Sequence, residues 1–507
     1  MHALMGTLLS DKFTENLSRV TQVTGAPGAR ALAALDHLVV CLPAAPPAAV
    51  WRELPQGTKL KALLKRAGDG AVPAIATRLA NERQTAVAVG LLAADTEPFE
   101  QLGFARKLLA PALGEKSVAL GVAVLGFDAS QAESIAERLV SAALAHGFAL
   151  ADFKSKREPP RIRSLRLLGL TRRLDLARIV AEARGNNLAR WLTALPPNKL
   201  DARAYVELLE ELARQQGWQF GKYGVRELAK LGAGAFLAVA QGNANDSAAI
   251  VRLRYRPEGT AAQPALGLVG KGIIFDTGGT NLKPFAAMSD MHIDMGGSAV
   301  AVGTLLALTA LRWPHAADCW CAITENRTGP TAYKSQDVVT ALNGKTVQTI
   351  HTDAEGRMVL ADTLALASRE RPRLIVDFAT LTGACITAVT KRYSGVFTNR
   401  PGLHPVLKRA GRDSGERVWP FPAGKEFLED LKSETADIAQ CLPDGAGDHI
   451  LAATFLNEFV PPEIPWIHVD LSAAKRKGGL AHVPTEITGF GVRYALHLLL
   501  DTEVGAL

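Results

Sequence analysis

The sequence predicts an α/β protein with a smaller N-terminal α/β domain and a larger C-terminal α/β/α domain around a mainly parallel central sheet. Short apolar runs alternate with helical patterns along the chain, which is typical of strands and helices that follow one another. Many of these runs are rich in valine, isoleucine and leucine without polar alternation, as in sheets covered on both faces. The composition shifts at 152–166, which indicates a boundary between two such regions.

We assign residues 1–170 to the N-terminal domain. Three short apolar runs predict buried strands, at His37–Leu42, Thr85–Leu92 and Ser117–Phe127. Gln131–Phe148 predicts an amphipathic helix, because its apolar positions recur on one face. The domain has no dense cluster of catalytic residue types, so we expect it to be non-catalytic.

The segment 152–166 is basic and contains a Pro-Pro pair, as exposed connectors often do. A helix is predicted from about Leu174 to Leu195, where Pro196 and Pro197 end it because proline has no N–H to donate. We therefore assign 171–195 to a connecting helix and 196–507 to the C-terminal domain.

Longer elements continue the alternation after residue 200. The predicted strands are Ala248–Tyr255, Ala265–Phe275, Cys319–Thr324, Leu374–Phe378 and Trp466–Leu471. The predicted helices are Ala202–Gln216, Met295–Arg312, Met358–Arg369 and Leu451–Phe459. Ligand sites in such sheets lie beyond the carboxyl ends of the strands, so polar residues at those ends are the candidates for function.

Composition excludes several classes of protein. With 48% apolar and 21% charged residues among 507, the chain is not of the disordered class. Five cysteines are too few for a disulfide scaffold and fit a reducing compartment, so we expect a cytoplasmic location. The first residues show no secretory signal, and the longest uncharged run, Met295–Leu311, is too short for a membrane span. A net charge of +7 leaves nucleic-acid binding through a basic surface, including 152–166, as an alternative function.

The first of two segments that contain candidate catalytic or metal-binding residues is Leu268–Gly297. A buried strand runs into Asp276 and a glycine turn follows at once. Lys271 lies inside this apolar strand, although charged residues are almost never fully buried without partners. Lys283 follows the turn, and Asp294 precedes the apolar helix.

The second such segment is His351–Ala367. Asp353 and Glu355 are two residues apart, so they point to the same side of an extended segment, and Arg357 follows them. Taken singly, Asp353 could cap the next helix and Asp276 could begin a turn. Taken together, four carboxylates and two lysines at strand ends are costly to assemble without a cation.

The charges indicate which cations would fit. Asp276, Asp294, Asp353 and Glu355 carry four negative charges, which two divalent ions neutralise. Oxygen ligands suit Mn²⁺, Mg²⁺ or Zn²⁺, and a pair of such ions can activate a bridging water and polarise a substrate oxygen. Lys271, desolvated beside two metals, would lose its proton and become a ligand. Lys283 could stabilise an oxyanion, and Arg357 could hold a small anion or carboxylate.

These motifs resemble those of the leucyl aminopeptidase (cytosol aminopeptidase) family of dinuclear metallopeptidases. The resemblance rests on VGKG-x-x-FD-x-GG-x-x-x-KP from Val269, M-x-x-DM-x-G from Met291, and the signature NTDAEGR-[LM] at His351–Met358. Further agreement lies in GAFLAVAQG from Gly234 and ATLTGAC from Ala379. The resemblance extends from about Ala183 to the C-terminus, and the N-terminal domain has no motif of its own.

The resemblance implies a metal-dependent aminopeptidase that hydrolyses the N-terminal residue, leucine or a similar one, from peptides with a free N-terminus. It implies two Mn²⁺ or Zn²⁺ ions per subunit and a homohexamer. One ion would be bound by Lys271, Asp276, Asp294 and Glu355, and the other by Asp276, Asp353 and Glu355. Lys283 would stabilise the tetrahedral intermediate, and Arg357 would hold a bicarbonate that acts as general base.

The resemblance also places Met291, Thr380 and Gly383 in the pocket for the first substrate residue, together with residues near Ser472. The chain departs from the family pattern at Ser472 and at two histidines. His351 replaces the usual asparagine of the signature, and His292 replaces a usual lysine. Each histidine is a new ligand or an ordinary packing and hydrogen-bonding residue, and we favour the second interpretation.

Two other functions remain as hypotheses. A two-metal phosphoesterase would also use carboxylates, but such sites usually add histidine ligands, and the buried Lys271 argues against it. A nucleic-acid-binding protein would use the basic segment, but aromatic residues are only 6% of the chain and no standard binding motif is present.

Overall fold

The computed structural model describes residues 20–25, 27–67, 70–113, 118–156, 162–261 and 263–506. The N-terminal segment for which the sequence predicts no secretory signal lies outside these residues, as does 157–161 of the basic connector. The chain forms two compact units. The first comprises Met1–Arg184 and Lys477–Glu486, and the second comprises Gly185–Arg476 and Ile487–Leu507. The short segment 477–486 thus groups with the first unit, whereas the sequence assignment keeps it in the C-terminal domain.

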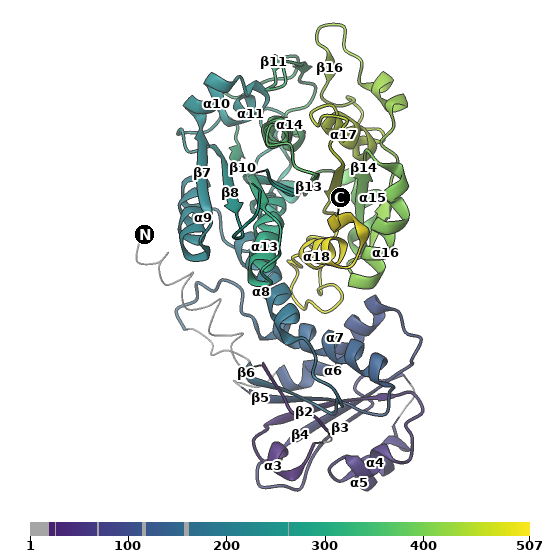
Figure 1. The fold of residues 1–507 in the computed structure, drawn as a ribbon. Helices are drawn as coiled ribbons and strands as arrows, with labels where there is room; N and C mark the ends of the chain where they lie inside the picture. Colours follow the sequence, from purple (N-terminus) through teal and green to yellow (C-terminus); the bar gives the residue numbers. More distant parts are fainter. Residues whose placement is uncertain are drawn as a thin grey trace. The chain divides into compact units, whose positions relative to one another are not determined.

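The first unit is a six-stranded sheet with helices (Figure 1). The strand order is β1-β6-β5-β2-β4-β3, and β3 is the antiparallel strand. Its strands are β1 Val20–Gln22, β2 His37–Pro43, β3 Ile75–Arg78, β4 Ala86–Leu92, β5 Val118–Val124 and β6 Ile162–Leu168. Its helices are α3 Ala29–Leu32, α4 Val50–Glu53, α5 Gly57–Leu64, α6 Pro98–Leu113 and α7 Ala129–Gly147, and α8 Leu176–Thr193 crosses the division between the units. The predicted strands and the predicted long helix of this region are confirmed, with Ser117 outside the described residues.

The second unit is built on an eight-stranded sheet in the order β15-β14-β17-β13-β9-β10-β8-β7. The four central strands β17, β13, β9 and β10 are parallel, while antiparallel pairs lie toward the edges. The strands are β7 Gln219–Gly224, β8 Ala249–Tyr255, β9 Leu266–Asp276, β10 Ala317–Asn326, β13 Leu374–Ala379, β14 Ser394–Thr398, β15 Val418–Pro420 and β17 Trp466–Asp470. A small second sheet contains β11 Val338–Thr340, β12 Thr346–Gln348 and β16 Ile438–Ala439. The predicted mainly parallel sheet is confirmed.

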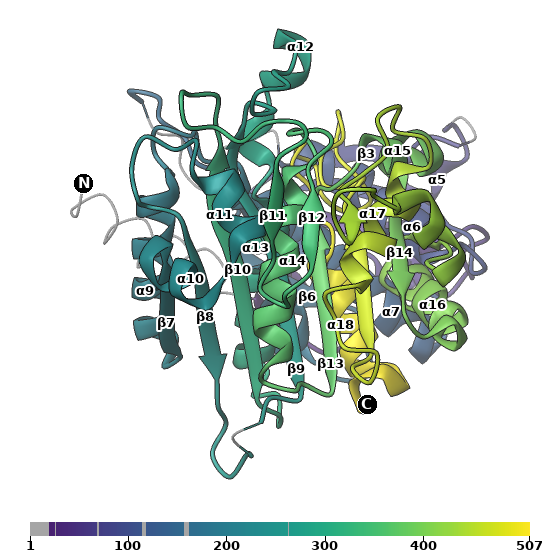
Figure 2. The ribbon, with the colours of Figure 1, turned by 90° about the horizontal axis from the view of Figure 1, so that it is seen from above.

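The helices of this unit lie on both faces of the sheet. They are α9 Ala202–Gln216, α10 Val225–Leu231, α11 Gly234–Ala240, α12 Phe285–Met288, α13 Gly296–Ala310, α14 Glu355–Ser368, α15 Gly383–Val389, α16 His404–Ser414, α17 Asp448–Asn457 and α18 Val492–Leu500. Short 3₁₀ helices are η1 Met291–Ile293, η2 Thr390–Arg392, η3 Pro401–Leu403, η4 Lys425–Leu431 and η5 Glu503–Ala506. Figure 2 shows α14 running along β10 and β9.

Two adjacent residues of β9 show how the central strand is covered. A Cβ at Gly270 would lie 2.4 Å from the Cα of Ser298 in α13. The next side chain, Lys271, reaches α14, where a Cβ at Gly356 would lie 2.7 Å from the lysine Nζ. Successive strand residues point to opposite faces, so α13 and α14 cover opposite faces of the sheet.

Helix α14 begins three residues earlier than the sequence predicts. The expected start is Met358, but the helix begins at Glu355 and leaves Asp353 in the preceding loop. The expectation that both residues lie in an extended segment is therefore wrong. An acidic residue is stabilised in the first turn of a helix by the free N–H groups and the helix dipole.

The apolar segment Phe285–Ala310 has the length and composition of a membrane span, but 83% of its apolar window is buried inside the protein. This matches a core helix, as predicted for Met295–Leu311. All five cysteines are buried and free. Cys319 and Cys321 have their sulfur atoms 4.0 Å apart on one face of β10, as their spacing predicts.

Candidate metal centre

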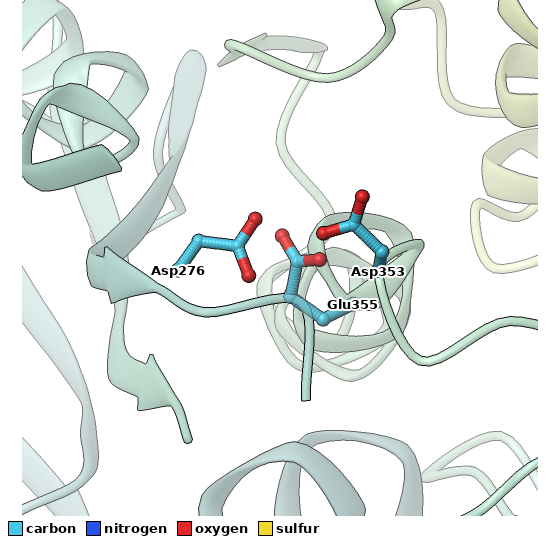
Figure 3. A group of neighbouring side chains, drawn as sticks. All are labelled: Asp276, Asp353 and Glu355. Atoms are coloured by element: carbon cyan, nitrogen blue, oxygen red, sulfur yellow. The ribbon is translucent and has the colours of Figure 1, made fainter. Parts of the chain in front are cut away.

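Three carboxylates converge at the carboxyl edge of the central sheet. Asp276 is the last residue of β9, Glu355 is the first residue of α14, and Asp353 lies in the loop just before it. Figure 3 shows the three side chains directed toward one another. One ligand oxygen from each lies within 4.8 Å of the others, so the group could hold a metal ion.

Two lysines compensate the charge of these carboxylates. Lys271 places its Nζ 2.8 Å from Asp294 Oδ2 and 2.9 Å from Glu355 Oε1. Lys283 places its Nζ 2.8 Å from Asp276 Oδ2 and also pairs with Asp353. The sequence-predicted ligands thus lie together, and Asp294 joins the cluster through Lys271.

Burial and mutual repulsion disfavour ionisation of the carboxylates. Burial raises the pKa of Asp294 to about 8, against the pull of Lys271. Burial and the charges of Asp276 and Glu355 raise the pKa of Asp353 to about 7. Protons therefore stay on this cluster near neutral pH, where a divalent cation would displace them.

The same charges raise the pKa values of the two lysines and so favour their charged form. Burial by itself would lower the pKa of Lys271, but the neighbouring carboxylates, led by Asp294 and Glu355, outweigh it and raise the pKa. The same balance raises the pKa of Lys283, where Asp276 is the largest opposing charge. The protein's own charges therefore keep both lysines as ammonium ions. A divalent ion on the same carboxylates would reverse the field at Lys271 and favour its neutral amine as a ligand.

The donor set fits divalent metal ions. Carboxylate oxygens and one amine suit hard or borderline cations such as Mn²⁺ and Zn²⁺. Asp276, Asp294 and Glu355 are each at most 5% exposed, so an unneutralised cluster of these charges would be costly. A cation among them would remove that cost.

Two neighbouring side chains orient the carboxylates. Asn326, at the end of β10 beside Asp276, donates from Nδ2 to Asp276 Oδ1 at 2.8 Å and to the Thr352 carbonyl at 3.0 Å. Thr380 donates from Oγ1 to Asp294 Oδ1 at 2.7 Å, and its carbonyl accepts from Lys271 at 3.0 Å. The sequence motifs give Asn326 no role, although a polar residue at the end of a strand next to β9 was an available signal.

Arg357 is buried and its guanidinium already has a counter-ion. Its Nη2 lies 2.7 Å from both carboxylate oxygens of Asp448, and its Nη1 donates to the Gln440 carbonyl at 3.1 Å. The sequence predicts that Arg357 holds a small anion or a carboxylate, and the family resemblance implies bicarbonate; in the structure the guanidinium pairs with the Asp448 carboxylate of the chain. Asp448 lies 91 residues away and begins α17, so no local pattern connects it with Arg357.

All predicted site residues line one cavity of about 670 Å³. They are Lys271, Asp276, Lys283, Met291, Asp294, Asp353, Glu355, Arg357, Thr380 and Gly383. His351 and Ser472 also line it. His351 Nδ1 accepts a hydrogen bond from the backbone N–H of Asp353 at 3.2 Å, which agrees with the hydrogen-bonding interpretation of this histidine.

Comparison with known proteins gives a consistent result. Residues 187–496 match the catalytic domain of the cytosol aminopeptidase family. A probable cytosol aminopeptidase of Syntrophotalea carbinolica is 37% identical over 412 residues, which cover 78% of this chain and 80% of that protein.

Solved structures with a similar fold include two enzymes. The bottromycin maturation enzyme BotP in complex with Mn has 30% identity and a TM-score of 0.79, and the match covers 91% of this chain and 98% of that one. The leucyl aminopeptidase of Leishmania major in complex with actinonin has 24% identity and a TM-score of 0.81, and the match covers 98% and 97% of the two chains.

The position of Asn326 generates a prediction about metal affinity. Asn326→Ala removes the donor that orients Asp276, so we expect Mn²⁺ affinity to fall by about 10–100-fold, as is common for residues that orient ligands. Isothermal titration of the metal-free protein would measure it. Asn243→Ala is the matched control, because Asn243 donates to Thr324 of the same strand. Equal affinities of the two variants would contradict the role given to Asn326.

Proposed function

The chain belongs to the cytosol aminopeptidase family, and we propose that its carboxylate cluster binds the two metal ions with which it removes the first residue of a peptide. The protein is a metallo-aminopeptidase, a hydrolase that acts on peptides. Family membership supports this function rather than the nucleic-acid-binding alternative. The observation that carries the assignment to this site is the convergence of Asp276, Asp353 and Glu355 beside the buried Lys271.

We assign the metal ligands by the family pattern. One ion would be held by Lys271, Asp276, Asp294 and Glu355, and the other by Asp276, Asp353 and Glu355. The short distances from Lys271 to Asp294 and Glu355 support the first set. The meeting of carboxylate oxygens within 4.8 Å supports the second. Mn²⁺ or Zn²⁺ is the proposed metal, and Mn in the related BotP structure favours Mn²⁺.

Residues of the chain would stabilise the reaction intermediate, orient the metal ligands and bind the substrate side chain. Two bound divalent ions would supply Lewis-acid activation of water and of the substrate carbonyl. Lys283 lines the same cavity, and its ammonium group would stabilise negative charge that develops on the carbonyl oxygen. Asn326 and Thr380 hold Asp276 and Asp294 in place. Met291, Thr380 and Gly383 line the same cavity and would contact the first side chain of the peptide, leucine or a similar residue.

Further proposals rest on the family resemblance. The first unit would be non-catalytic, the protein would be cytoplasmic, and six identical subunits would assemble. The name cytosol aminopeptidase, which the relatives carry, supports the location. Light scattering on the purified protein would give the subunit number.

Release of p-nitroaniline from leucine p-nitroanilide tests the function directly. We expect cleavage of the free-amine substrate, loss of activity after EDTA treatment, and recovery with Mn²⁺. The N-acetylated substrate should not be cleaved, because an aminopeptidase needs the free α-amino group.

The metal assignment has its own control within the same assay. Glu355→Ala should lose at least about 10²-fold in activity, and added Mn²⁺ should not restore it, since the residue is assigned to both ions. Glu325→Ala removes a carboxylate that pairs with Arg327 and should remain close to the native rate. Native-like activity of Glu355→Ala would show that the metal assignment is wrong.

The raised pKa values predict how metal binding depends on pH. Asp294 and Asp353, with pKa values of about 8 and 7, hold protons at pH 6 that Mn²⁺ must displace. Mn²⁺ affinity should therefore rise with pH by roughly tenfold per pH unit for each proton released, with the contribution of Asp353 ending near pH 7, that of Asp294 near pH 8, and a further proton released when Lys271 binds as an amine. Competition with a metal indicator at several pH values would measure this rise. A constant affinity between pH 6 and 8 would contradict the protonated cluster.

A further inference from the structure

Arg357 is a buried cation that needs an anion. It is 1% exposed, lies two residues after Glu355 in α14, and lines the substrate cavity. A buried guanidinium without a counter-charge is strongly destabilising, so some negative group must accompany it. In this chain the group is Asp448, with both carboxylate oxygens 2.7 Å from Nη2.

The remaining donors of Arg357 leave little room for a second anion. Its Nη1 donates to the Gln440 carbonyl. Its Nε is buried and has no hydrogen-bond partner among the described residues. An external anion on Nε would lie on the same guanidinium as the Asp448 carboxylate. One positive charge does not neutralise two negative ones, and the two anions would repel each other.

The Asp448 carboxylate also remains accessible from the cavity. It is 22% exposed, and it lines the same cavity as the metal ligands. Asp448 begins α17, where the helix dipole stabilises a negative charge in the first turn. The carboxylate is therefore held between a helix N-terminus and a buried arginine.

We propose that Asp448 replaces the external bicarbonate at Arg357, so that this chain carries the anion of its active site as a built-in side chain. Asp448 then neutralises Arg357 and takes the general-base role that the family resemblance gives to bicarbonate, because its carboxylate faces the cavity and can accept the proton of the attacking water. The aminopeptidase reaction would proceed without added bicarbonate. This inference rests on the proposed function of the site.

The experiment compares the native protein with Asp448→Ala in CO₂-free buffer, with and without millimolar sodium bicarbonate. The matched control is Asp413→Ala, because Asp413 also pairs with an arginine, Arg412, but does not line the cavity. Hydrolysis of leucine p-nitroanilide with Mn²⁺ is the first readout. The second is the melting temperature of the metal-free protein, with sodium chloride at equal ionic strength as the reference salt.

We expect the native protein and Asp413→Ala each to show the same activity with bicarbonate as without it. Asp448→Ala should lose at least about tenfold in activity, and bicarbonate should restore most of it. Bicarbonate should also raise the melting temperature of Asp448→Ala by several degrees, and sodium chloride should not. A residue with only a structural role would show the loss without this rescue.

Two results would overturn the proposal. Native activity that falls in CO₂-free buffer and returns with bicarbonate would show that an external anion displaces Asp448. An Asp448→Ala protein that does not respond to bicarbonate in either readout would show that Asp448 does not occupy an anion site. If Asp448→Ala does not fold, Asp448→Ser also removes the carboxylate and leaves room for bicarbonate beside Arg357. The same two results would overturn the proposal in that variant.

The activity and the melting temperature distinguish a failure of this proposal from a failure of the proposed aminopeptidase function. If the native protein cleaves no aminoacyl anilide with Mn²⁺, the proposed function fails. The melting temperatures still test whether removal of Asp448 creates a bicarbonate site at Arg357.

Discussion

The compensation of buried negative charge governs the architecture of this site. Four carboxylates come together where water is largely excluded, and their repulsion would separate them without cations in their midst. Lys271 and Lys283 supply that charge, each by bridging two carboxylates. Divalent ions on the same oxygens would take over this role, so the arrangement that stabilises the protein also prepares it for metal.

The central sheet makes this convergence possible. Strand β9 lies between β13 and β10, with α13 on one face and α14 on the other. Gly270 lets α13 approach closely, and the neighbouring Lys271 extends toward α14 and its first residue, Glu355. Strands β9 and β10 are parallel, and a shift of register after Thr324 places Asn326 opposite Asp276. A rigid scaffold of this kind holds ligands at fixed distances, as metal-dependent chemistry requires.

Arg357 shows that the same rule of charge compensation applies next to the metal cluster. Its partner comes from the first turn of α17, far along the chain, and the pair links this helix to α14. Where an enzyme binds a small anion from solution, its activity depends on the supply of that anion. A carboxylate provided by the chain removes this dependence.

The sequence by itself determined the α/β class and the succession of strands and helices along the chain, and it predicted the charged residues that the structure brings together. Apolar runs and their spacing indicate which faces of strands and helices are buried. A lysine within an apolar strand indicates a charged partner, because a lone buried charge is costly. The sequence misplaced the start of α14 and gave no role to Asn326 or to the partner of Arg357. Only the tertiary structure decided these points. The pairing of Asn326 with Asp276 depends on strand register, and the pairing of Arg357 with Asp448 depends on the meeting of two helices 91 residues apart, which no local pattern encodes.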